Sequence, residues 1–215
     1  MMNSAVLFSG GKDSCYSVYW ALNHGFDVKY LLTMLPQNPE SYMFHYPCLG
    51  QTSKQAKSMG IKHILAKTSG EKEKELADLS KALRSLDIDY VFTGALASSY
   101  QKYRIESLCE MLGLKPVSPF WGADQYLLFK RIILDGFEIR MVSVSAEGLG
   151  PEWVGRKLDL VALEALSQLH RKYGISIGGE GGEFETFVTN SPLFSDPVPI
   201  SGEKIWKGTS GYLKS

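Results

Sequence analysis

Cysteine is scarce in this sequence, and its three cysteines, Cys15, Cys48 and Cys109, lie far apart and form no CxxC pair. An odd number without close spacing argues against a disulfide framework and against a zinc or iron–sulfur site. No apolar run approaches the roughly 20 residues that cross a bilayer, and the first residues lack the charged segment that opens a signal peptide. We therefore expect a protein of the reducing cytoplasm that has no membrane partner.

An excess of either charge is also absent, because 23 Lys and Arg residues balance 23 Asp and Glu residues. A surface without net positive charge offers nucleic acid little long-range attraction, so we expect no nucleic-acid partner. The 215 residues suffice for one ordinary domain with at most a small additional part, because a chain of this size buries about 70% of its extended surface on folding.

The first 119 residues alternate short apolar runs with segments of helical periodicity. Strands are predicted at 5–8, 28–34, 64–66 and 90–93, and helices at 13–23, 51–59, 72–86 and 99–112. This alternation predicts the α/β class, with a doubly wound parallel sheet that carries helices on both faces.

The pattern changes after Pro119, where we place a boundary between a first domain, residues 1–119, and a second domain, residues 120–215. The tail from Ser191 contains three prolines and is expected to form loops with short edge strands. The second domain is therefore predicted to be a smaller α+β part. Its helices are predicted at 125–134 and 158–173, and its strands at 138–144 and 184–189.

The strongest chemical signal lies where the first strand meets the first helix, in the string Ser9-Gly10-Gly11-Lys12-Asp13-Ser14. Two glycines let the backbone approach an anion closely, and the N-terminus of a helix offers free N–H groups and a positive dipole end. The string is not a Walker A loop, because Val6 occupies the position of the first glycine. The alternative is an ordinary helix cap at Asp13. A place at the carboxyl end of a strand favours phosphate binding.

An acidic string, GEGGEFET, begins at Gly179 and contains Glu180, Glu183 and Glu185. If the chain is extended from residue 183 onward, Glu183 and Glu185 point to one face, and the pKa of one of two close carboxyls rises. One of them could act as a base or hold a cation. The alternative is a glycine-rich turn that leads into an ordinary edge strand.

A third signal follows the fourth predicted strand, which ends at Gly94 on the same rim as the first loop. Tyr100 and Arg104, in the first turns of the next helix, could face a nucleotide at that rim. The alternative is a solvated helix start with a surface charge cluster of Arg104 and Glu106.

The string from Ser9 to Ser14 resembles the pyrophosphate-binding loop of the N-type ATP pyrophosphatases, which have the adenine-nucleotide α-hydrolase-like (PP-loop) fold and cleave ATP to AMP and pyrophosphate. With segments 40–45, 94–114, 148–150 and 172–188, the chain resembles the short form of the diphthine–ammonia ligase family. The resemblance implies that the carboxylate of diphthine, a modified histidine of translation elongation factor 2, attacks the α-phosphate of ATP. Free ammonium would then displace AMP from the acyl adenylate and leave diphthamide.

The resemblance also implies roles for individual residues. ATP would be bound by Ser9, Gly10, Gly11, Lys12, Asp13, Ser14, Gly94 and Tyr100, and Mg²⁺ by Asp13. The catalytic residues would be Lys12, Asp13, Arg104, Glu183 and Glu185. The acceptor would be bound by Tyr103, Glu180, Glu183, Phe184, Glu185 and Thr186.

Diphthine carries a quaternary ammonium, and the acidic string beside Trp121 or Trp153 could form an acidic, aromatic pocket for it. His45 is a further candidate for the active site. The sequence leaves open whether the chain forms a homo-oligomer, which glutamate is the base, and whether residues 36–50 close over ATP.

Two alternative functions stay open. A different PP-loop enzyme would adenylate tRNA, although the missing CxxC pairs and the balanced charge argue against that acceptor. A non-catalytic ATP-binding module would keep the nucleotide loop but would not need the acidic string. Pyrophosphate release in the presence of an acceptor would distinguish a catalyst from such a module.

Overall fold

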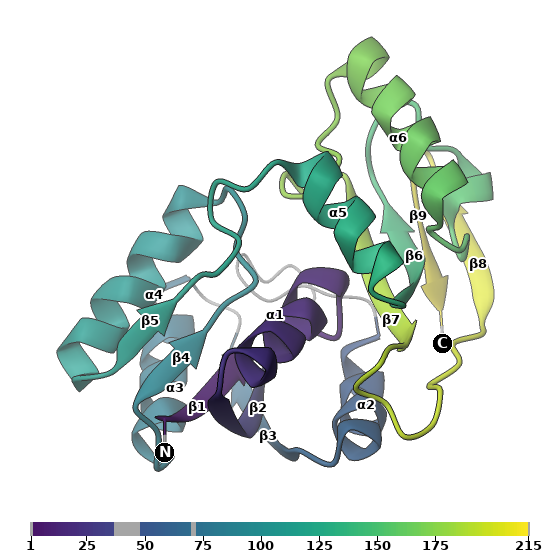
Figure 1. The fold of residues 1–215 in the computed structure, drawn as a ribbon. Helices are drawn as coiled ribbons and strands as arrows, with labels where there is room; N and C mark the ends of the chain where they lie inside the picture. The colour runs from purple at the N-terminus through teal and green to yellow at the C-terminus, as the bar shows by residue number, and fades with distance from the viewer. Residues whose placement is uncertain (1, 37–47, 70–71, 215) are drawn as a thin grey trace.

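The structure is a computed structural model that describes residues 2–36, 48–69 and 72–214 (Figure 1). It contains a parallel sheet formed by the first half of the chain and an antiparallel sheet formed by the second half. The candidate residue His45, and most of the 36–50 segment, lie outside the described residues.

The parallel sheet has five strands in the order β3-β2-β1-β4-β5. The strands are β1 (Met2–Leu7), β2 (Phe26–Pro36), β3 (Lys62–Thr68), β4 (Tyr90–Phe92) and β5 (Lys115–Val117). They are connected by α1 (Lys12–Asn23), a 3₁₀ turn (Leu49–Gln51) with α2 (Thr52–Met59), α3 (Lys72–Arg84) and α4 (Ser99–Leu112). The predicted doubly wound parallel sheet is confirmed, with β1 at its centre.

Alternating side chains of β1 explain why helices cover both faces of this sheet. Val6 packs with Cys15 of α1 in one hydrophobic cluster, to which α2 also contributes. Ala5 packs with Leu79 of α3 in a second cluster, to which α4 also contributes. Since successive residues of a strand point to opposite faces, α1 and α2 cover one face and α3 and α4 cover the other.

The antiparallel sheet has the order β7-β6-β9-β8. Its strands are β6 (Glu138–Val144), β7 (Phe184–Asn190), β8 (Glu203–Lys207) and β9 (Ser210–Lys214). In Figure 1, α5 (Gln125–Leu134) and α6 (Leu160–Tyr173) lie in front of it, and a 3₁₀ turn (Pro151–Trp153) precedes α6. Both helices begin after an aspartate cap: the side chains of Asp124 and Asp159 accept hydrogen bonds of 2.8 and 2.9 Å from backbone N–H groups of the first turn.

The two sheets share one hydrophobic core. Val6 and Phe92 of the parallel sheet belong to the same buried cluster as Val144 and Val188 of the antiparallel sheet. The backbone N–H of Val188 also donates a 3.0 Å hydrogen bond to the carbonyl of Gly10. The loop after β1 is therefore held against the edge of β7, and the domain boundary near residue 119 stays a prediction.

Several elements differ from the sequence predictions. The short edge strand β5 was not predicted, because its three residues include Pro116 and carry no alternating pattern. Helix α6 begins at Leu160, two residues later than predicted, after its cap at Asp159. The tail forms two paired strands of five residues each, β8 and β9, and β9 lies inside the sheet beside β6.

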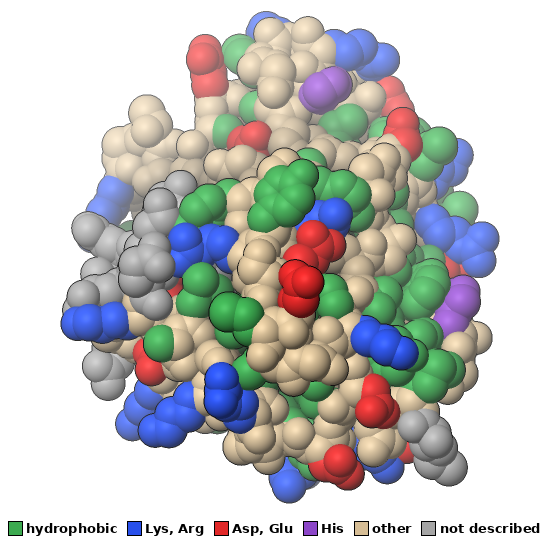
Figure 2. Space-filling model, turned by 90° about the vertical axis from the view of Figure 1, so that its left-hand side faces the viewer, with side chains coloured by type: hydrophobic (Ala, Val, Ile, Leu, Met, Phe, Trp, Pro, Cys, Tyr) green, Lys and Arg blue, Asp and Glu red, His purple; other side chains and the backbone are tan. Residues whose placement is uncertain are grey.

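Figure 2 views the molecule from the left-hand side of Figure 1, where α4 lies, and on this face Lys and Arg side chains are interspersed with Asp, Glu and hydrophobic ones. This mixture agrees with the equal numbers of acidic and basic residues in the sequence. Among the described residues, no helix has both the length and the apolar character needed to cross a bilayer.

Candidate active site

A cavity of about 740 Å³ opens at the carboxyl ends of β1 and β4. The chain leaves β1 toward β2 on one side, whereas β4 pairs with β1 on the other side. Open α/β sheets bind their ligands at such a switch point of strand order. One wall of the cavity consists of the loops after β1 and β4, and the opposite wall comes from residues 178–182 and 184–186 and from β6 and β9. The cavity therefore lies between the two sheets.

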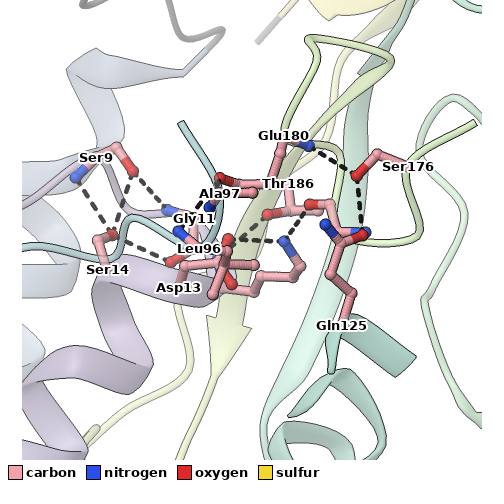
Figure 3. Close-up of polar contacts among 12 residues, drawn as sticks. Ser9, Gly11, Asp13, Ser14, Leu96, Ala97, Gln125, Ser176, Glu180 and Thr186 are labelled. Carbon is pink, nitrogen blue, oxygen red and sulfur yellow. Dashed lines mark hydrogen bonds and ion pairs between the residues drawn. The ribbon is translucent and has the colours of Figure 1, made fainter. Parts of the chain in front are cut away.

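The loop after β1 is braced by its two serines. The hydroxyls of Ser9 and Ser14 lie 3.2 Å apart, and the Ser14 hydroxyl donates to the Gly11 carbonyl at 3.1 Å (Figure 3). Gly10 has a φ of +79°, a left-handed conformation that suits glycine. The turn presents the N-terminus of α1 to the cavity, as the sequence predicted for a phosphate-binding loop.

Lys12 and Asp13 form a buried ion pair at the start of α1. The Lys12 Nζ atom donates to Asp13 Oδ2 at 2.7 Å and to the Gly178 carbonyl at 2.6 Å, and only 2% of Lys12 is exposed. Burial raises the pKa of Asp13, and the charge of Lys12 opposes that rise. Among the described residues, no group hydrogen-bonds to the second, buried oxygen of Asp13, Oδ1. One carboxylate oxygen is therefore available to a cation at the cavity wall.

Gly94 brings the loop after β4 against the start of α1. A Cβ atom at this position would lie 2.8 Å from the backbone carbonyl carbon of Asp13 and 2.9 Å from the backbone nitrogen of Ser14. Both distances are too short for a side chain, so glycine permits the contact. The structure thus brings the two predicted loops together.

Glu180 connects the acidic string to the loop after β4. Its Oε2 atom accepts hydrogen bonds from the backbone N–H groups of Leu96 at 3.2 Å and Ala97 at 3.1 Å (Figure 3). Burial raises the pKa of Glu180, and the nearby charge of Asp13 raises it further, while Lys12 and the two N–H groups oppose the rise. Glu180 is therefore a cavity residue that also fixes the shape of the rim.

Glu183 and Glu185 do not form the matched pair that the alternation predicted, because β7 begins only at Phe184. The Glu183 carboxylate accepts from the backbone N–H groups of Ser176 at 3.0 Å and Gly181 at 2.8 Å, and it does not line the cavity. Its contacts hold the glycine-rich loop together.

Glu185 lines the cavity, and burial raises the pKa of its carboxyl to about 8. Asp13 and Glu180 act in the same direction, whereas Lys12 opposes them. A buried carboxyl with a pKa near neutral pH is a candidate acid or base.

The remaining residues of the acidic strand anchor the loop after β1. Thr186 Oγ1 accepts the backbone N–H of Lys12 at 3.1 Å. Phe184 is buried, and its ring centroid lies 6.0 Å from Lys12 Nζ. Both residues line the cavity, so the predicted acceptor strand and the predicted ATP loop are in direct contact.

Helix α4 contributes partly different residues to the cavity from those the sequence predicted. Tyr100, Lys102 and Ile105 line it, but Arg104 and Tyr103 do not. The Arg104 guanidinium carbon lies 5.0 Å from the Tyr100 ring centroid, whereas 65% of Tyr103 is exposed.

The two tryptophans predicted as pocket walls do not line the cavity. Trp153 is 4% exposed in the core, whereas the Trp121 ring lies 4.7 Å from the Nζ atom of Lys102, a residue that does line the cavity.

Two glutamines that the sequence analysis did not identify hold the cavity walls. Gln55 of α2 is fully buried, and its Nε2 atom donates to the carbonyls of Gly10 at 3.0 Å and Val188 at 2.7 Å. Gln125 of α5 accepts from the Gly178 N–H and the Ser176 hydroxyl, both at 2.9 Å. The only sequence signal that could have identified either residue was the position of Gln55 on the apolar side of the predicted helix 51–59.

The described residues contain no cluster of three or more His, Cys, Asp or Glu side chains arranged to hold a metal ion.

Comparisons with known proteins cover nearly the whole chain. Residues 2–116 match the family model of the diphthamide synthase N-terminal domain, and residues 125–215 match that of the C-terminal domain. The chain is 28% identical to a human diphthine–ammonia ligase, over 95% of this chain and 85% of that protein. It is 32% identical to a diphthine–ammonia ligase of Danio rerio, over 90% of this chain and 84% of the relative.

Among solved structures, a predicted subunit of tRNA methyltransferase from Methanocaldococcus jannaschii aligns with 89% of this chain and 98% of its own. The TM-score is 0.48 and the sequence identity 20%, values too low to support a conclusion about function.

Proposed function

The chain belongs to the diphthamide synthase family, and we propose that the cavity between its two sheets carries out the ligase reaction of that family. Its function is that of an ATP-dependent diphthine–ammonia ligase. The observation that best supports this use of the cavity is the double contact of Lys12. Its backbone N–H and its ammonium bind Thr186 and Gly178, so the nucleotide loop and the acidic strand face one space.

We assign ATP to the loop side of the cavity. The N-terminus of α1 attracts the terminal phosphates through its dipole and its N–H groups. An ammonium has three donors, and the two contacts of Lys12 with Asp13 and Gly178 leave one donor for a phosphate oxygen. Stabilising pyrophosphate as it leaves is the contribution we propose for this loop.

The residues present fit a Mg²⁺ ion held by Asp13. The buried Oδ1 atom has no hydrogen-bond partner among the described residues, and Mg²⁺ prefers oxygen ligands that it can share with phosphate. When bound, the ion would offset the negative charge of the phosphates beside Asp13 and Glu180.

The acceptor would enter from the side of the acidic strand. One carboxylate oxygen of diphthine attacks the α-phosphorus, the bond from that phosphorus to the β-phosphate oxygen breaks, and pyrophosphate leaves. Ammonia then attacks the acyl carbon and AMP departs with the transferred oxygen. Glu185 is the proposed base that takes a proton from ammonium, since a carboxyl with a pKa of about 8 holds a proton far better than an ordinary one.

Under this proposal residues 1–119 bind ATP and residues 120–215 bind the acceptor, which is translation elongation factor 2 in the cytoplasm. Free ammonium is the proposed nitrogen donor. The remaining candidates act indirectly: Glu180 and Glu183 shape the acidic loop through backbone N–H groups, and Arg104 lies against Tyr100.

The test is an incubation of the purified chain with MgATP, ammonium and elongation factor 2 that carries diphthine. We expect AMP and pyrophosphate in equal amounts, together with the mass change of a carboxyl converted to an amide on the modified histidine. AMP formation without a change in the factor would indicate another acceptor, such as tRNA. ATP binding without any turnover would indicate a non-catalytic module.

A further inference from the structure

Three residues on three neighbouring strands form a row on the cavity wall. In the pairing register, Ser143 of β6 lies opposite Glu185 of β7 on one side and opposite Tyr212 of β9 on the other. Residues directly opposite each other in an antiparallel sheet project to the same face. Glu185, Ser143 and Tyr212 all line the cavity. This set is called the acceptor row below.

The neighbouring positions show which way the acceptor row faces. Val144 pairs with Phe184 one residue further along, and both side chains are buried in the shared core, at 0% and 2% exposure. Adjacent residues of a strand point to opposite faces. The acceptor row therefore projects from the face of the sheet opposite to Val144 and Phe184, which line another part of the same cavity, and the 39% exposure of Tyr212 agrees with this orientation.

The dimensions of the row suit a compact cation. Neighbouring strands lie about 4.8 Å apart, so the backbones of Glu185 and Tyr212 are separated by roughly 10 Å. The short side chain of Ser143 lies between them and leaves room above it. The row thus has a carboxyl at one end, an aromatic ring at the other and a gap in the middle.

We infer that the acceptor row is a subsite for a quaternary ammonium group, with Tyr212 as its aromatic wall and the ionised form of Glu185 as its counter-charge. A quaternary ammonium has no N–H to donate, so it is recognised by the faces of aromatic rings and by negative charge. The inference rests on the proposed function, because diphthine carries its trimethylammonium group on the carbon next to the reacting carboxylate.

The position of the row explains how the reacting group would be aimed. Thr186, the residue after Glu185 in β7, accepts the backbone N–H of Lys12 at 3.1 Å, so the Glu185 end of the row lies toward the nucleotide loop. A cation held above Ser143 would direct the adjacent carboxylate to that loop. Tyr212 thus provides the aromatic wall that the sequence analysis assigned to Trp121 or Trp153.

The test compares Tyr212→Leu, which removes the ring, with Tyr212→Phe, which keeps it, and Ser143→Leu, which fills the gap. Tyr173→Leu is the matched control, because Tyr173 has 37% exposure and lies at the end of α6, outside the cavity wall. Steady-state kinetics are measured with elongation factor 2 that carries diphthine. The same kinetics are measured with a second acceptor, which carries an unmethylated amine in place of the trimethylammonium group.

We expect Tyr212→Leu and Ser143→Leu to raise KM for the diphthine-bearing factor about tenfold, while KM for ATP stays within about twofold. Tyr212→Phe and Tyr173→Leu should resemble the wild type. Preference for diphthine over the unmethylated acceptor should disappear in Tyr212→Leu. The subsite would be overturned if Tyr212→Leu kept the wild-type KM and the preference for diphthine. It would also be overturned if Tyr212→Phe lost as much affinity for the diphthine-bearing factor as Tyr212→Leu.

Binding of tetramethylammonium to the ATP-loaded chain, measured by calorimetry, keeps this test separate from the proposed function. If the wild type binds tetramethylammonium and neither Tyr212→Leu nor Ser143→Leu does, the subsite is supported even if no amidation occurs. Equal binding by all variants, or none by the wild type, would contradict it. ATP binding by each variant checks that it is folded.

Discussion

The ammonium of Lys12 donates a 2.6 Å hydrogen bond to the carbonyl of Gly178, which lies 166 residues further along the chain. The same ammonium pairs with Asp13, so one buried cation connects the nucleotide loop, the carboxylate next to it and the glycine-rich acidic loop. The active site therefore exists only when both sheets are assembled around it. Removal of Lys12 would leave Asp13 buried without its counter-charge, which is costly.

The carboxylate of Asp13 tests the cation site. Asp13→Asn keeps the shape of the side chain but removes its charge, so we expect pyrophosphate release to fall at least about 100-fold and to need more Mg²⁺. Titration of activity with Mg²⁺ measures both effects. Asp124→Asn, which retains a helix cap outside the cavity, is the control and should behave as the wild type. Unchanged Mg²⁺ dependence in Asp13→Asn would exclude Asp13 as a ligand.

The pH profile of amidation tests Glu185 as the base. Its pKa of about 8 means that the carboxylate form increases as pH rises through this value, so kcat for amidation should rise over the same interval. Glu185→Gln should lose this part of the profile and most of the amidation rate, while its affinity for ATP stays close to that of the wild type. The same pH profile in the variant would mean that another group, or ammonium itself, titrates there.

Glu185 also makes a prediction for stability. Its folded pKa of about 8 lies above the ordinary value of 4.5, so the folded state binds the proton more tightly than the unfolded state. The free energy of unfolding should therefore decrease as pH rises from about 4.5 to about 8. Glu185→Gln removes this loss, and at pH values above 8 it should be more stable than the wild type by about 1 kcal/mol or more.

Denaturant titration at several pH values measures that difference. Glu183→Gln is the contrasting variant, because the Glu183 carboxylate accepts two backbone hydrogen bonds, and its loss should destabilise the protein. If Glu185→Gln were instead less stable than the wild type at high pH, the conclusion that burial raises the pKa of Glu185 would be contradicted.

Gln55 is expected to position the nucleotide loop. Gln55→Leu leaves the carbonyls of Gly10 and Val188 without this buried donor, which should lower the free energy of unfolding by about 1–3 kcal/mol. It should also raise KM for ATP more than KM for the acceptor, a split that a general loss of stability would not produce. Gln168→Leu, on the exposed side of α6, should change neither quantity.

The first loop could be predicted because its signals are local. An apolar strand, two glycines and a helical periodicity lie within one short stretch, so the local sequence is enough to place Ser9–Ser14 between a strand and a helix of an α/β fold. Gly94 could be predicted for a similar reason, since the carboxyl ends of parallel strands share one rim. The structure adds the physical need for glycine there, which is the approach of the Asp13 backbone.

Other parts of the site depend on tertiary register and could not be derived from local pattern. Ser143 and Tyr212 meet Glu185 only through the pairing of three strands, and Gln55 reaches Val188 across 133 positions of sequence. Tyr103 lies outside the cavity wall, and its position in the sequence alone does not fix the rotation of α4. Glu183 was paired with Glu185 because the sequence did not show that β7 starts at Phe184.

The most direct test of the account follows one oxygen atom. Elongation factor 2 with heavy oxygen in the diphthine carboxylate is incubated with the chain, MgATP and ammonium, and the products are analysed by mass spectrometry. An acyl adenylate predicts that one labelled oxygen moves from the factor into AMP as the amide forms. Label in inorganic phosphate with release of ADP, or amide formation without label in AMP, would contradict the proposed chemistry of this cavity.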